Sequence, residues 1–392
     1  MACIAVAIIV VTGWRTGGPA GERAAGQGTS PGADAPAITD PPLRIPVPGH
    51  EVYGYVPYWE MDDGIAAHVA ATELTTLALF SVTHGNGGHV ATNQNGYKRI
   101  VGGVGERLID EAHQRGVRVE LVYTSFGQKK NDTFFSRVDL QDTAIAELVA
   151  LGQDLGFDGI NVDVELIPAE HVPAYAAFVA RLRDAWLAVD PDGSVSVATT
   201  ANINGAAMAA SAAIAGADRI FLMGYDYHWA GSGPGASAPL DRRDGSEKDL
   251  TWSLDLYRDL GVPAERTILG LPLYGMSWQA SGPEPGVTAT SRGDAWIPRH
   301  NLAHLADPTA TSTFDPIEGV QVLAIPDGDE WQAIYYDTPE TLATKLALAD
   351  DRGLAGGGFW AIGYERGLPE YSRLIATFAA GDLRTWTPAG PP

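Results

Sequence analysis

The sequence is poor in cysteine and in basic residues. Its 392 residues include a single cysteine, Cys3, which excludes an intramolecular disulfide framework and any zinc or iron–sulfur site built on cysteine. The 26 Lys and Arg residues against 48 Asp and Glu give a formal charge of -22, and the basic residues form no cluster. Nucleic-acid binding depends on clustered Lys and Arg, so we expect no nucleic-acid partner, and adhesion to an anionic membrane surface is disfavoured.

Metal-binding and nucleotide-binding patterns are also missing. The nine His residues form no HExxH or comparable cluster, so we expect no metal in the mechanism. No GxGxxG segment opens a helix after the first predicted strand, which disfavours a dinucleotide site. No GxSxG segment stands between a predicted strand and a helix, since the match GTSPG at residues 28–32 lies in a Gly- and Pro-rich stretch, and this disfavours a serine hydrolase. We therefore expect a protein that works without a cofactor.

The two ends of the chain differ in composition from its centre. Residues 1–14 form a short apolar run that predicts a signal-peptide core or anchor, although the usual preceding basic residues are missing. Residues 15–50 are rich in Gly, Ala and Pro and predict a flexible linker, and residues 386–392 predict a disordered tail. The folded part is expected at residues 51–385. We expect a monomer that is secreted or tethered to the cell surface, with no other membrane association.

One arrangement recurs along the folded part: a helical stretch ends in glycine and a β-rich apolar segment follows at once. The glycines Gly116, Gly156, Gly261 and Gly353 each stand where a helix favours a left-handed C-terminal residue. Helices that feed strands repeatedly predict a parallel sheet covered by helices. With four further apolar runs, the count is eight strands over roughly 330 residues, which favours an α/β fold of the (β/α)8 TIM barrel type.

Residues 276–334 interrupt this pattern between predicted strand 7 and its helix. They are rich in Pro, Gly, Thr and Asp, and their clear apolar runs are AWIP and VQVLAIP. A structureless loop of this length would be unusual in a compact domain. We therefore predict a small α+β subdomain, inserted between strand 7 and helix 7, that walls one side of the cleft.

The segment FDGINVDVE, residues 157–165, is the most informative in the chain. As a strand it alternates, so its aliphatic residues face the helices while Asn161, Asp163 and Glu165 point into the barrel. Burying two carboxylates and an amide is costly, so they need partners and a task. Chemistry in such barrels takes place at the C-terminal end of the strands, where Glu165 lies. The alternative is a buried polar network that only fills the barrel.

This segment resembles, position for position, the active-site signature of the family-18 glycoside hydrolases, the chitinases and related N-acetylglucosaminidases. LMGYDYHW is similar to the family's Met-x-Tyr-Asp on strand six, LGLPLYG to its strand-seven segment, and GGGFWAIGY to the strand-eight segment with the subsite tryptophan. The insertion also falls where many members carry an extra subdomain. The resemblance covers the whole barrel and implies a secreted O-glycosyl hydrolase that acts on β-linked N-acetylglucosamine polymers such as chitin.

The resemblance also implies a role for each matching residue. Glu165 would be the general acid that protonates the glycosidic oxygen. Asp163 and Tyr225 would hold the acetamide of the substrate, whose own carbonyl oxygen attacks the anomeric carbon, so hydrolysis would proceed with retention. The residues expected to bind substrate are Trp360 under the cleaved sugar, Asp226, Met223, Asn161, Tyr55 and Trp59. The side chain of Asp158 points to the opposite face of the strand, and Asp158 is predicted to be structural.

Two departures from the family pattern stand out. Asn161 replaces the commoner Asp, as in the spore-germination and peptidoglycan-directed branch, and a neutral amide beside Asp163 should let that carboxyl ionise more readily than in an Asp–Asp pair. The family's Ser-x-Gly-Gly on strand three is only faintly echoed from Thr124 to Gly127, so no serine is expected to support the site.

Three questions stay open at this level. The substrate could be chitin or the glycan strand of peptidoglycan, and the acid excess is unfavourable for an anionic wall but indifferent to neutral chitin. The barrel could also be a non-catalytic, chitinase-like carbohydrate-binding protein, which the retained Glu165, Asp163 and Tyr225 argue against. Trp229 and Trp278 also follow predicted strands, where their rings could either stack on sugars or lie in the core.

Overall fold

The structure is a computed structural model that describes residues 50–387. The expected signal or anchor segment (1–14), nearly all of the expected linker (15–50) and most of the expected tail (386–392) lie outside the described residues. Within residues 50–387, no helix combines the length and apolar character that crossing a membrane requires.

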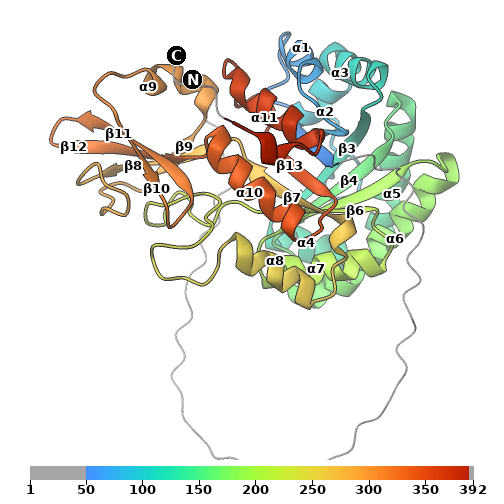
Figure 1. The fold of residues 1–392 in the computed structure, drawn as a ribbon. Helices are drawn as coiled ribbons and strands as arrows, with labels where there is room; N and C mark the ends of the chain where they lie inside the picture. Colours follow the sequence, from blue (N-terminus) through green and yellow to red (C-terminus); the bar gives the residue numbers. More distant parts are fainter. Residues whose placement is uncertain (1–49, 388–392) are drawn as a thin grey trace, which may run out of the picture. The chain divides into compact units, whose positions relative to one another are not determined.

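Eight parallel strands close into a barrel (Figure 1). Their order around the ring is β1-β13-β7-β6-β5-β4-β3-β2, so strands neighbour one another in chain order and β13 closes the ring between β7 and β1. The barrel strands are β1 (Glu51–Pro57), β2 (Thr76–Thr83), β3 (Arg118–Phe126), β4 (Gly159–Glu165), β5 (Ser194–Thr200), β6 (Arg219–Met223), β7 (Thr267–Pro272) and β13 (Gly356–Trp360). The predicted (β/α)8 TIM barrel is confirmed.

Helices follow the strands and cover the outside of the barrel (Figure 1). They are α1 (Ile65–Ala70), α2 (Asn95–Ile100), α3 (Gly103–Gln114), α4 (Gln128–Phe135), α5 (Val138–Leu155), α6 (Val172–Val189), α7 (Ile203–Ile214), α8 (Leu250–Asp259), α10 (Pro339–Asp351) and α11 (Pro369–Ala379). Gly156 ends α5 in the left-handed conformation, with φ of 77°. Gly116, Gly261 and Gly353 also have positive φ, as the glycine-to-strand pattern predicts.

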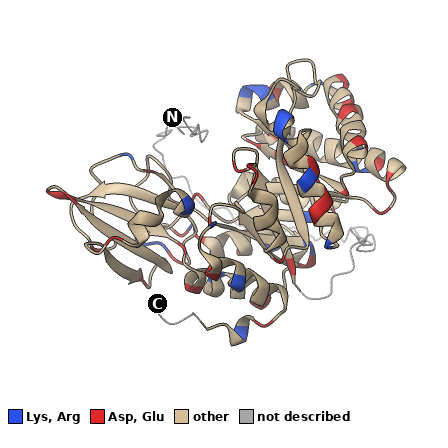
Figure 2. Cartoon of the chain, turned by 90° about the horizontal axis from the view of Figure 1, so that it is seen from above, with Lys and Arg blue, Asp and Glu red and all other residues tan. Residues whose placement is uncertain are grey.

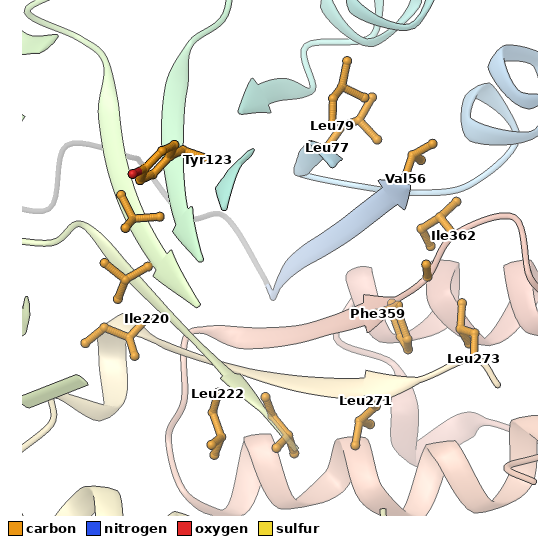
Figure 3. Close-up of a cluster of buried hydrophobic side chains, with 14 of the residues drawn as sticks. Val56, Leu77, Leu79, Tyr123, Ile220, Leu222, Leu271, Leu273, Phe359 and Ile362 are labelled. Atoms are coloured by element: carbon orange, nitrogen blue, oxygen red, sulfur yellow. The ribbon is translucent and has the colours of Figure 1, made fainter. Parts of the chain in front are cut away.

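The main core lies between the strands and the helices. Outward-facing side chains of the strands, such as Leu77 and Leu79 of β2 and Leu271 of β7, are fully buried there (Figure 3). Each such side chain contributes about 1.5–3 kcal/mol by leaving water. The inner faces of the strands form a second, separate cluster inside the barrel, which contains Tyr53, Tyr55, Phe80, Phe221 and Met223.

A five-stranded antiparallel sheet is inserted between β7 and α10 (Figure 1). Its strands, in the order β10-β11-β12-β8-β9, are β8 (Gly275–Ala280), β9 (Asp294–Trp296), β10 (Thr311–Asp315), β11 (Val320–Asp327) and β12 (Glu330–Tyr336). A 3-10 turn (Pro298–Asn301) and the short helix α9 (Leu302–Leu305) lie between β9 and β10. The predicted small insertion between strand 7 and helix 7 is confirmed.

Ion pairs tie the insertion to the barrel. Arg299 of the insertion and Arg366, which follows β13, both donate to the carboxylate of Glu60 in the loop after β1. The same two guanidinium groups bind Asp62, at 2.8 Å from Arg299 and 2.7 Å from Arg366. Glu60 is only 1% exposed, so this cluster joins three separate segments around a buried carboxylate. Elsewhere, acidic residues are spread over the helices and the insertion with fewer basic residues among them (Figure 2).

Candidate active site

Strand β4 carries a row of polar side chains inside the barrel, as its alternation predicts. Asn161 and Asp163 are buried there, and Glu165 at the end of the strand is half-buried. The intervening residues that pack outward in the main core are Ile160, Val162 and Val164. Because side chains alternate along a strand, one nine-residue segment supplies both the core contact and the polar row.

The lowest layer of this row is a closed hydrogen-bonded network. Asn161 donates to the Ser196 hydroxyl at 2.7 Å and accepts from the Tyr55 hydroxyl at 3.1 Å. Ser196 donates in turn to Glu120 at 2.5 Å, and the same carboxylate accepts from Tyr53 at 2.5 Å. Burial raises the pKa of Glu120. We infer that this layer, which includes Asn161 and Tyr55, supports the site from below.

Glu120 is a residue that the sequence-based prediction missed. It stands in the run VRVELVY, where it alternates with Val119 and Leu121 of the main core. The same parity argument that placed Asn161 inside the barrel would have placed Glu120 there. Its partners could not be anticipated, because they come from β1 and β5.

Asp163 is the next residue of β4, after Asn161, whose side chain points into the barrel. It is 4% exposed, and its Oδ1 atom is buried without a hydrogen-bond partner. Its neighbours in adjacent strands are Thr124 and Ala198. Burial, followed by the charge of Glu165, raises the pKa of Asp163 well above its ordinary value. The neutral amide of Asn161 removes one neighbouring negative charge, but burial still raises the pKa of Asp163.

The hydroxyl groups of β3 are engaged elsewhere. Thr124 donates to the Val82 carbonyl at 3.2 Å, and Ser125 donates to Asn131 at 2.6 Å. Neither hydroxyl donates a hydrogen bond to the buried Oδ1 atom of Asp163. This agrees with the faint match to the family's Ser-x-Gly-Gly and leaves the buried Oδ1 atom free to accept from a ligand.

Glu165 stands at the C-terminal end of β4, at the opening of the barrel. Its carbonyl oxygen accepts from the side-chain amide of Asn131 at 2.5 Å, which anchors the end of the strand. Burial, followed by the charge of Asp226, raises the pKa of Glu165 from 4.5 to about 7. A carboxyl with this pKa carries a proton in part of the molecules at neutral pH, as a general acid requires.

Backbone strain gathers at the same opening. Among residues 50–387, the non-glycine residues with positive φ are Leu166, at 61°, and Asp226, at 62°. Leu166 directly follows Glu165. Asp226 accepts a hydrogen bond from the Tyr274 hydroxyl through its carboxylate, and its backbone N–H donates to Ser237 at 3.1 Å. Such strained positions cluster at functional sites, where the surroundings hold them in place.

Aromatic side chains line the other side of the opening. The Trp360 ring lies 4.7 Å from Phe80, 5.6 Å from Tyr55 and 6.2 Å from Trp59, between ring centroids. Trp59 is 39% exposed and donates through its indole N–H to Tyr364 at 3.1 Å. Aromatic faces at an opening suit the apolar faces of sugar rings.

Tyr225 follows β6 and Met223 ends it. The Tyr225 ring is T-shaped against Tyr274, with centroids 6.2 Å apart. Burial is the main cause of its well raised pKa, and the charges of Tyr55 and Asp163 add to it, so its hydroxyl keeps its proton and lies near both groups. The structure thus places Tyr225 near Asp163 and Asp226, whereas Asn161 and Tyr55 lie in the network beneath them.

Other sequence candidates lie outside this opening or in the core. Trp278 is 1% exposed and packs against Tyr335 as part of the main hydrophobic core. Asp158 binds His113 at 2.9 Å and the backbone N–H of Val119 at 2.7 Å, in agreement with the predicted structural role. Within the described part of the chain, no three metal-binding side chains are grouped to hold a metal ion.

A closed (β/α)8 barrel with a half-buried acid at the strand ends, above a buried aspartate and beside aromatic rings, has the groups that general acid catalysis on a sugar requires. Comparison with known proteins agrees. The sequence profile of the glycosyl hydrolases family 18 matches residues 51–365, and the chain belongs to that family.

Curated relatives match over part of their length. Chitinase 63 of Streptomyces plicatus is 28% identical over 224 residues, which are 52% of this chain and 35% of the relative. Endochitinase 1 of Metarhizium robertsii is 29% identical over 255 residues, which are 58% of this chain and 56% of the relative. The matched region thus spans only about a third to just over half of these relatives.

Solved structures share the fold at low identity. The spore cortex-lytic enzyme SleL of Bacillus cereus is 17% identical with a TM-score of 0.68, over 84% of this chain and 74% of that one. The family-18 chitinase of Cycas revoluta, solved in complex with (GlcNAc)3, is 18% identical with a TM-score of 0.69, over 84% of this chain and 99% of that one. At these identities the likeness shows the fold alone.

Proposed function

We propose that this protein hydrolyses β-linked N-acetylglucosamine polymers, chitin or chitin-like, by retaining, substrate-assisted catalysis. The observation that carries the proposal is the pair on β4. Glu165 at the opening has a pKa of about 7, and Asp163, two residues deeper, holds a buried carboxylate oxygen with no partner. A proton donor at the opening and an unfilled acceptor below it suit a sugar that carries an acetamide.

In the first step, Glu165 gives its proton to the glycosidic oxygen as the bond to the anomeric carbon breaks. The acetamide carbonyl oxygen of the same sugar forms the new bond to that carbon, so the nucleophile belongs to the substrate. Asp163 accepts a hydrogen bond from the acetamide N–H, and Tyr225 holds the same group. A well-oriented internal nucleophile has an effective molarity of order 10⁵ M or more, which replaces a carboxylate nucleophile from the protein.

In the second step, water opens the cyclised intermediate. Glu165, now ionised, takes a proton from that water as the water attacks the anomeric carbon, and it returns to its starting state. The two displacements retain the configuration of the sugar. Polymers of this kind are components of extracellular walls and coats. We therefore also propose that the protein acts outside the cell.

The test compares chitin oligomers with the same oligomers lacking the N-acetyl group, and with cello-oligosaccharides. Only the acetylated oligomers should be cleaved, with retention shown by NMR of the fresh products, and a thiazoline analogue of the intermediate should inhibit strongly. Efficient cleavage of a de-N-acetylated oligomer would overturn the substrate-assisted mechanism. Binding of chitin oligomers without any cleavage would assign a carbohydrate-binding protein instead of an enzyme.

A further inference from the structure

Lys130 places a positive charge at the same edge of the barrel as Glu165. It lies in α4, which begins directly after β3, and its ammonium donates to the Thr83 hydroxyl at the end of β2, at 2.7 Å. Thr83 donates in turn to the Thr124 carbonyl at 2.7 Å, and Thr124 is paired with Asp163 of β4. The ammonium is therefore held at the C-terminal end of β2, with β3 between it and β4, the strand of Asp163 and Glu165.

This ammonium has no counter-ion in the described part of the chain. Lys130 is half-buried, and none of the ion pairs within residues 50–387 includes it. By contrast, the fully buried Lys345 pairs with Asp337. The chain has 48 acidic residues against 26 basic ones, so acidic partners are abundant. A half-buried cation left unpaired in such a chain is costly unless an anion reaches it at some stage.

The neighbouring titratable side chain, His84, cannot act as the counter-ion, because an imidazole is either neutral or positively charged. Burial, followed by the charge of Lys130, lowers the pKa of His84 to about 3, so the imidazole is neutral at physiological pH. Its Nδ1 atom is hydrogen-bonded to the Tyr123 hydroxyl at 2.6 Å. Burial lowers the pKa of Lys130 to about 8, which still leaves most of the ammonium charged at neutral pH.

From this geometry we propose that Lys130 is a specificity residue that binds a carboxylate of the glycan, so the preferred substrate is an N-acetylated glycan with carboxylate substituents. The inference rests on the proposed function and narrows its substrate. Glycan strands of peptidoglycan have this chemistry where the peptide stem is absent, because every second sugar is an N-acetylmuramic acid whose lactyl carboxylate is then free. Asp163 and Tyr225 would hold the acetamide of one sugar while Lys130 binds the carboxylate of its neighbour. Chitin carries no such group and would gain nothing from Lys130.

The experiment measures kcat/KM on three substrates: a chitin oligomer, a peptide-free peptidoglycan strand, and the same strand with its carboxylates converted to methyl esters. The wild-type protein should cleave the free-acid strand about tenfold better than its ester, as one charge-assisted hydrogen bond predicts. This comparison needs no variant, so a folding defect cannot obscure it.

Variants then assign the preference to the residue. Lys130→Gln should reduce the acid-over-ester preference about tenfold and leave cleavage of the chitin oligomer within twofold, and Lys130→Arg should keep most of the preference. Lys129→Gln, which removes an exposed neighbouring charge on the same helix, is the matched control and should change neither rate.

Three outcomes would overturn the inference. No acid-over-ester preference in the wild type would refute it while the proposed function stands on chitin cleavage. An equal loss on all three substrates in Lys130→Gln would make the residue structural. Failure to cleave all three substrates would overturn the proposed function, and this inference with it.

Discussion

The carboxyl of Glu165 differs from an ordinary glutamic acid through its surroundings alone. Burial and the nearby charge of Asp226 raise its pKa to about 7, so the protonated form persists at neutral pH. Glu165→Gln keeps the size of the side chain and removes the proton. We expect turnover of chitin oligomers to fall about 10²–10⁴-fold while affinity is largely kept. Steady-state rates and calorimetric binding check this, and more than a tenth of wild-type turnover would exclude Glu165 as the acid.

The same pKa sets two dependences on pH. In the proposed mechanism Glu165 acts in its protonated form, so kcat/KM should fall as pH rises through about 7. The folded-state pKa lies above the unfolded value of about 4.5, so the contribution of Glu165 to stability is intact below pH 4.5, falls as pH rises from 4.5 to 7, and is fully lost above pH 7. Glu165→Gln should therefore be more stable than the wild type at pH 8, by at most ~3 kcal/mol, and equal to it at pH 4. Chemical denaturation at both pH values measures the difference, and an equal difference at both would contradict it.

On the scale of an element, strand β4 shows how a local pattern meets distant partners. The alternation of its side chains depends only on consecutive residues. The neutral amide of Asn161, by contrast, is explained by the hydroxyl of Ser196 and the carboxylate of Glu120 below it. The single hydroxyl proton of Ser196 already goes to Glu120, so Ser196 can accept from an amide but cannot donate to a second carboxylate.

Asn161→Asp tests this arrangement. The new carboxyl would lie near Glu120 and Asp163 in a buried site, so its pKa should rise and it should stay protonated up to a higher pH than an ordinary Asp. A raised folded-state pKa means that stability is kept near pH 5 and lost as pH rises to 8, by about 1–3 kcal/mol relative to the wild type. Thermal unfolding at the two pH values measures this. Asn204→Asp, at a half-buried site bonded to the Ile167 carbonyl, is the control and should depend less on pH. Equal losses at pH 5 and 8 would show that position 161 is not coupled to the carboxylates.

On the scale of the whole molecule, the insertion is held to the barrel by the cluster around Glu60. Burial raises the pKa of Glu60, and the guanidinium of Arg299 opposes this rise. Because Trp59 directly precedes Glu60 and binds Tyr364, the cluster also orients one aromatic ring of the opening. The backbone N–H of Arg299 donates to the Tyr364 carbonyl at 2.8 Å, which joins the insertion to the same point.

Arg299→Met should loosen this joint without unfolding the barrel, since Arg366 still neutralises Glu60. We expect faster hydrogen exchange in residues 275–336, a stability loss of about 1–3 kcal/mol, and a raised KM for long oligomers with a smaller change in kcat. Arg258→Met, which breaks exposed ion pairs on α8, is the control and should have little effect. Unchanged exchange in the insertion, or an equal effect of the control, would contradict the role of this cluster.

By itself, the sequence determined the eight strands, the glycine-terminated helices, the place of the insertion, and the inward face of residues 157–165, because these features depend on neighbours along the chain. Family resemblance then pointed to Glu165 and its companions. Only the tertiary structure decided which distant residues meet: Asn161 with Ser196, 35 residues apart, and Glu60 with Arg299, 239 residues apart. It also decided the raised pKa of Glu165 and the unpaired ammonium of Lys130. These properties arise from burial and close contact between separate strands, which local spacing does not encode.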